Sequence, residues 1–189
     1  MEQKDILKMR IHQIMITNAL ILLVLLCYFS AISVLEITQT QLFLILGAMI
    51  LVQSIVAFVR RNSTKSIFPI FEKVNVYEKK KMGPEWFKQR KLNAYTTLFL
   101  SGIMFFQAYL NRASTYSAFP FELGFIVFII FILLIVLNLG MFLHIRKVDK
   151  HQSPEEFKGY TQNSIILGVI LGFVLSIIIV VGITYYVVR

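Results

Sequence analysis

Long apolar runs, separated by blocks of charged residues, alternate along this chain. Five of these runs are 17 to 24 residues long. A helix rises about 1.5 Å per residue, so runs of this length match a hydrocarbon core of about 30 Å. The pattern predicts an all-α fold, a polytopic transmembrane helical bundle of about five spans. We expect the spans at residues 14–35, 42–59, 94–110, 123–143 and 165–188.

Composition excludes a soluble protein as the alternative. The chain is 57% hydrophobic and 15% charged, whereas soluble domains have about 25% charged residues. The first run follows three cations, as in a secretory signal peptide, but it is longer than the 7 to 15 apolar residues of such signals. We therefore expect it to remain as a helix of one integral membrane domain covering residues 1–189. The lone Cys27 allows no intramolecular disulfide and is expected to be a small packing residue.

The positions of the cations predict the orientation. Of 19 Lys and Arg residues, three precede the first run, ten lie in residues 60–91 and four in residues 146–158. A five-span chain places these 17 on one side and leaves Arg112 and Arg189 on the other. By the positive-inside rule the amino terminus is cytoplasmic and the carboxyl terminus is outside. The net charge of +9 is thereby explained by orientation, and we expect no nucleic-acid partner.

Two of the segments expected to be cytoplasmic, 60–93 and 144–163, contain a similar sequence motif. PEWFKQRKLN begins at Pro84 and PEEFKGYTQN at Pro154, with five identities in ten positions. Ser or Gly followed by Pro and Glu is typical of a helix start, and Ser153 with Glu156 forms a Ser-x-x-Glu capping pattern. We expect short amphipathic helices on the inner leaflet, whose aromatic and basic side chains contact anionic lipid. The residues expected at this cytoplasmic interface are Trp86, Phe87, Lys88, Arg90, Lys91, Phe157 and Lys158.

The shared motif has two interpretations. One is a tandem repeat of a two-span unit, at residues 42–110 and 123–188. The other is that helices starting from the same membrane face simply resemble each other. Sequence alone leaves both open.

Polar groups inside the expected spans are few. The runs contain no ionisable side chain near their centres, which argues against a proton-coupled carrier. The intramembrane polar residues are Asn18, Gln53, Gln107 and Asn138, and we expect Gln53 and Asn138 to bond to neighbouring helices. The fifth span also has a helix-packing seam, in which small residues recur every fourth position: Ser164, Gly168, Gly172 and Ser176. Such a seam lets another helix approach closely, either from the same chain, from a second copy or from a different membrane protein.

These features favour a non-catalytic, multi-pass protein of the plasma membrane, with no catalytic, cofactor or metal site. Ile- and Lys-rich usage indicates a bacterial source. Expected partners are anionic lipids, another membrane protein or a second copy at the fifth span, and a cytoplasmic protein at residues 60–93. Accessory, sensor and immunity-type roles all fit. The alternatives are a small permease subunit that works with a cytoplasmic ATPase, and a lipid-modifying enzyme of the inner leaflet that uses Glu85, His144, Glu155 or Glu156.

Overall fold

The computed structural model describes residues 3–35, 37–113, 123–151 and 153–188, and within these ranges the chain is almost entirely helical, with no strand. It forms two compact units, residues 1–120 and 121–189, which are described separately. Arg189, which the charge pattern predicts on the outer side, lies outside the described residues.

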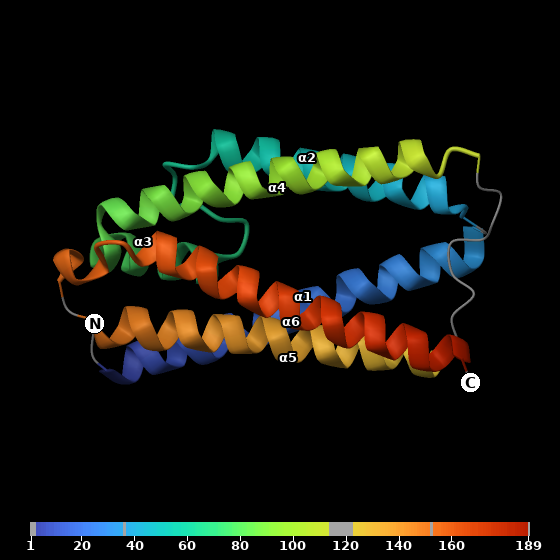
Figure 1. Ribbon diagram of the computed structural model, residues 1–189. Coiled ribbons are helices and arrows are strands. Elements are labelled where there is room, and N and C mark those ends of the chain that lie inside the picture. Colours follow the sequence, from blue (N-terminus) through green and yellow to red (C-terminus); the bar gives the residue numbers. More distant parts are fainter. Residues whose placement is uncertain (1–2, 36, 114–122, 152, 189) are drawn as a thin grey trace. The chain divides into compact units, whose positions relative to one another are not determined.

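The first unit contains four helices: α1 (Gln3–Leu35), α2 (Gln39–Val59), α3 (Pro69–Met82) and α4 (Pro84–Leu110) (Figure 1). Helix α2 begins with a capping box at Thr38. The backbone N–H of Gln41 donates to the hydroxyl of Thr38, and the backbone N–H of Thr38 donates to the side-chain oxygen of Gln41. This pair satisfies two backbone donors that a helix start otherwise leaves free.

Helix α3 is the amphipathic element between the two long helices. It begins with Pro69 at its first position and has Glu72 in its first turn, while three lysines, residues 79–81, lie in its last turn. Both charge placements complement the helix dipole. The helix ends at Gly83, whose φ of 56° is a conformation that side chains with a Cβ rarely adopt. α4 then starts at Pro84, so Gly83 is the hinge between the two helices.

Helices α2 and α4 lie antiparallel and side by side over most of their lengths (Figure 1). Three bonds from side-chain hydroxyls to backbone carbonyls fix their register. The hydroxyl of Ser54 donates to Ala94 over 3.0 Å and that of Ser101 to Gly47 over 2.9 Å, while Thr40 donates to the carbonyl of Asn111 near the opposite end. The two serines are buried between the helices. The helices therefore form one tightly packed hairpin.

Helix α1 is attached to this unit at both of its ends. Near the turn into α2, Ile32, Ile37 and Leu42 form a buried apolar cluster, with Tyr28 and Leu46 packed against it. At its amino-terminal end α1 contacts α3, where Met9 and Arg10 are buried. The amino-terminal cations and those of residues 60–91 thus lie toward the same end of the unit.

The second unit is a helical hairpin made of α5 (Leu123–Lys150), a single 3-10 turn η1 (Pro154–Phe157) and α6 (Tyr160–Val188). Its buried side chains gather at the turn: Val148 from α5, Phe157 from η1 and Tyr160 from α6. Gly182 of α6 lies beside Phe128 of α5, so the helices also approach each other away from the turn.

All five predicted apolar runs lie within helices. In the described part of the chain, four helical stretches are long and apolar enough to cross a membrane: Gln3–Ile32, Gln39–Val59, Ile126–Lys150 and Pro154–Gly182. The predicted run at residues 94–110 is not among these four. It forms the carboxyl-terminal part of α4, a helix whose opening turns are polar. The prediction of a helical membrane protein is therefore supported, while the apolar run of α4 contains several polar side chains: Thr96, Thr97, Ser101 and Gln107.

The two copies of the Pro-Glu-x-Phe-Lys motif adopt different structures. The copy at Pro84 is the first turn of α4 and continues without a break. The copy at Pro154 is the separate turn η1, followed by Gly159 with φ 77°, and α6 starts only at Tyr160. The hydroxyl of Ser153 donates to the carboxylate of Glu156 and makes no bond to the backbone, so the expected capping pattern does not cap a helix here.

Candidate functional site

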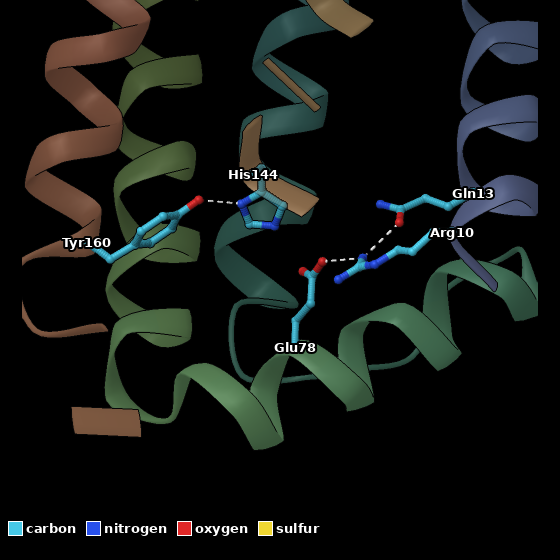
Figure 2. A network of polar contacts seen from close by, with 5 residues as sticks. All are labelled: Arg10, Gln13, Glu78, His144 and Tyr160. Carbon is cyan, nitrogen blue, oxygen red and sulfur yellow. Dashed lines mark hydrogen bonds and ion pairs between the residues drawn. The ribbon is translucent and has the colours of Figure 1, made fainter. Parts of the chain in front are cut away.

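A buried ion pair joins α1 to α3 in the first unit. The Nη1 atom of Arg10 donates to Oε1 of Glu78 over 2.7 Å and to Oε1 of Gln13 over 2.8 Å (Figure 2). The side chains of Arg10 and Glu78 are 4% and 10% exposed, and the guanidinium also lies 5.3 Å from the ring centroid of Tyr77. Removing one partner of such a pair is strongly destabilising, because the remaining buried charge loses its closest opposite charge.

Arg90 of α4 fastens the loop that follows α2. Its Nη1 atom donates to the carbonyls of Arg60, over 3.2 Å, and Ser63, over 2.6 Å. Its guanidinium lies 4.4 Å from the ring centroid of Trp86, a cation–π distance. Burial lowers the pKa of Arg90, and the nearby charge of Glu78 partly opposes that effect. Residues 60–68 are also held from α3, where the amide of Asn75 donates to the carbonyl of Thr64 over 3.3 Å.

These contacts shape a pocket of about 320 Å³, which we call the basic pocket. It lies among the end of α2, the loop 60–68, α3 and the start of α4. Its ionisable lining residues are all cations: Arg60, Lys65 and Arg90. Three amide side chains complete its polar wall, and they come from α2, α3 and α4: Gln53, Asn75 and Asn93. The rest of the lining is mainly apolar, with Val56, Ala57, Ile67 and Phe68.

The other interface residues predicted on α4 do not line the basic pocket. Trp86 is only 2% exposed and packs edge-on against Phe87, which is 37% exposed. Lys88 pairs with the buried carboxylate of Glu85 over 2.7 Å, and Lys91 lies over the ring of Tyr95. Of the two aromatic residues, Phe87 therefore has the exposure that a lipid contact requires, while Trp86 belongs to the packing around Arg90.

The interface residues predicted in the second unit occupy its turn. Phe157 is fully buried, against the ring of His151 on one side and Tyr160 on the other, whereas Lys158 is exposed. The hydroxyl of Tyr160 shares a hydrogen bond with Nδ1 of His144, and this bond ties α6 to α5 (Figure 2). The amino group of Lys147 lies over the same tyrosine ring. Phe157 is thus a core residue of its unit.

The four intramembrane polar residues have different surroundings. Asn138 donates to the carbonyl of Leu134 one turn earlier in its own helix. Gln53 lines the basic pocket, and its expected bond to a neighbouring helix stays a prediction. The backbone carbonyl of Gln107 accepts from the amide of Asn111, and both Gln107 and Asn18 are partly exposed. Bonding of Asn138 across to a neighbouring helix stays a prediction.

The predicted seam on α6 is open among the described residues. A methyl group added to Gly168 or Gly172 would meet no other heavy atom within 4 Å, and Ser176 bonds to the carbonyl of Phe173 in its own helix. A closer contact at a glycine occurs between α2 and α4, where a Cβ at Gly47 would lie 3.1 Å from the ring of Phe105.

The predictions from sequence did not include two groups of residues that the structure brings together, although one group follows a regular repeat in the sequence. Small residues recur at intervals of seven in α2, at Thr40, Gly47 and Ser54. They recur in the same way in α4, at Ala94, Ser101 and Ala108. A seven-residue repeat keeps one face of a helix turned toward its partner. The second group, Arg10 and Glu78, carries no local signal, because the two residues are 68 positions apart.

Comparison with known proteins adds no family to this picture. No family model, no curated protein and no solved structure matches the chain. Among the described residues, no group of three His, Cys, Asp or Glu side chains is arranged to hold a metal ion. The basic pocket and the ion pair beside it are therefore the candidate functional site on the strength of their geometry.

Proposed function

We propose that the chain is a multi-pass protein of the plasma membrane with five spans, a cytoplasmic amino terminus and an external carboxyl terminus. The antiparallel pairing of α2 and α4 supports the fifth span. If α2 crosses the bilayer, α4 lies along it over most of its length and crosses it as well. Its small-residue face is covered by α2, which suits a helix of moderate hydropathy.

The distribution of charge within each unit supports the orientation. In the first unit the cations before residue 11 and those of residues 60–91 lie toward one end, while Arg112 follows the opposite end of α4. In the second unit the cations lie around the turn between α5 and α6. With the basic ends facing the cytoplasm, both units obey the positive-inside rule.

We further propose that the protein is a non-catalytic accessory subunit, whose ordered basic end binds a partner on the inner face. We call this end the basic platform: residues 60–68, α3 and the first turns of α4. The observation that carries the proposal is the buried Arg10–Glu78 pair. A segment that served orientation alone would need only solvated charges. Here α3 is anchored to α1 through buried charge, and its exposed lysines are presented on a fixed helix.

Purification in a mild detergent tests this proposal. We expect a second protein to co-purify in a fixed ratio with the wild-type chain. Reversing the charge of two exposed α3 lysines, by Lys73→Glu and Lys80→Glu together, should release it, because neither residue is buried in the fold. The matched control is Lys4→Glu with Lys8→Glu, which reverses two exposed charges on α1. A monomer with no bound protein, or equal loss in both double variants, would contradict the proposal.

A further inference from the structure

We propose that the basic pocket binds the phosphate group of an anionic phospholipid, with the glycerol portion against its apolar wall. Three cations gathered around one cavity repel each other unless an anion lies between them. Arg60, Lys65 and Arg90 are so arranged, and the lining contains no carboxylate. Basic pockets between transmembrane helices on the cytoplasmic side are suited to phospholipid headgroups.

The carboxylate of Glu78, whose charge acts on Arg90, lies outside the lining of the pocket. Glu78 acts on Arg90, but its own carboxylate is engaged with Arg10 at 2.7 Å. Arg90 is held in place by two backbone carbonyls and the ring of Trp86. The protein thus presents a fixed, partly buried cation at the inner wall of the pocket. Arg60 and Lys65, which are both exposed, complete the rim.

The composition of the wall favours a lipid over a free anion. The polar groups of the pocket continue into an apolar surface formed by Val56 of α2 and by Ile67 and Phe68 of the loop. Ile67 is 82% exposed, which is unfavourable in water but suited to contact with acyl or glycerol carbons. The first cation after the apolar run of α2 is Arg60, so the pocket lies where headgroups begin. A volume of about 320 Å³ matches a headgroup rather than a whole lipid.

The chain provides its own reporter for this site. Trp86 is its single tryptophan, and the indole ring lies against the guanidinium of Arg90. An anion that binds at Arg90 alters the electrostatic field at the indole, so the emission of Trp86 should respond. Purified full-length protein in a neutral detergent would be titrated with phosphatidylglycerol in mixed micelles. Parallel titrations would use phosphatidylcholine, glycerol 1-phosphate and inorganic phosphate.

We expect a saturable change in emission with phosphatidylglycerol and none with phosphatidylcholine. Arg60→Gln and Lys65→Gln should each weaken the apparent affinity about fivefold, since each removes one cation near the phosphate. Arg61→Gln is the matched control, because Arg61 is an exposed neighbour of Arg60 that does not line the pocket. It should leave the affinity unchanged.

Three results would overturn the proposal. Equal weakening in Arg61→Gln would show that only the overall charge of the surface matters. A response to inorganic phosphate without a response to phosphatidylglycerol would exclude the lipid as ligand. Native mass spectrometry that finds no retained phosphatidylglycerol on the wild-type protein would do the same. The partner proposal fails separately, because a protein with no bound partner can still show the full lipid response.

Discussion

At the scale of single residues, Glu78 is the central charge of the first unit. It receives a direct bond from Arg10 and acts through space on Arg90. Arg90 in turn holds two carbonyls of the loop after α2. One carboxylate on α3 therefore stabilises cations from α1 and α4, and these cations shape the ends of the elements around the basic pocket.

Glu78→Gln should destabilise the protein strongly. The substitution removes the carboxylate charge that lies 2.7 Å from the buried guanidinium of Arg10, and breaking comparable buried pairs costs about 3–5 kcal/mol. Thermal unfolding in a mild detergent, followed by Trp86 fluorescence, measures the change. Glu72→Gln is the control, because it makes the same substitution on the same helix at a position whose contribution through the helix dipole is about 0.3–1 kcal/mol. Comparable losses in the two variants would show that the Arg10–Glu78 pair has no special weight.

Arg90→Lys should loosen the loop while leaving the helices intact. Lysine keeps the charge but has no planar fork and stacks less well on an aromatic ring. The bonds to the carbonyls of Arg60 and Ser63 would then weaken together. Hydrogen–deuterium exchange should become faster in peptides covering residues 60–68 and remain unchanged in α2. Lys91→Arg, a swap at the neighbouring exposed position, should change neither region, and a faster exchange there would contradict this account.

At the scale of elements, the α2–α4 hairpin depends on backbone proximity rather than on large side chains. Two buried serines bond to backbone carbonyls of the facing helix, and Gly47 makes room for Phe105. Each interhelical hydrogen bond in membrane proteins contributes only about 0.6 kcal/mol on average, so close packing along the whole interface provides the larger share. Such an interface is sensitive to added volume at its small residues.

Gly47→Leu should separate the hairpin, whereas Gly102→Leu should not. A Cβ at Gly47 would already lie 3.1 Å from the ring of Phe105, while a Cβ at Gly102 meets nothing within 4 Å among the described residues. Overpacking of this kind costs about 1–3 kcal/mol. Thermal unfolding should show the loss for Gly47→Leu only. Cys residues can also be introduced at Ser54 and Ala94 in a Cys27→Ser background. The disulfide between them should form more slowly when Gly47→Leu is added. Equal effects of the two leucines would mean that the helices do not pack in this register.

At the scale of the whole molecule, the sequence predicts the helices that a membrane environment requires. It does not predict the contacts between residues that are far apart in the chain. Apolar runs must be helical in a bilayer because every backbone group needs an internal partner, and all five runs are helical. The break at Gly159 could not be predicted, because the same motif starts a long helix at Pro84 and forms an isolated turn at Pro154. Of the candidate site, Arg90 could be singled out as a cation of the basic segment that precedes a predicted span. The pocket could not, since its lining comes from three helices and a loop.

The number of spans is the property of the whole molecule on which the orientation depends. If α4 crosses the bilayer beside α2, residues before and after it face opposite sides. Asn62 lies in the turn after α2 and Ala113 in the turn after α4, and both are exposed. In a Cys27→Ser background, a membrane-impermeant maleimide should label Ala113→Cys in intact cells. It should label Asn62→Cys only after the membrane is permeabilised, because residues 60–91 carry ten of the cations and are retained inside. Labelling of both positions from the same side would mean that α4 does not cross, and a four-span chain with both termini on one side would replace the five-span arrangement.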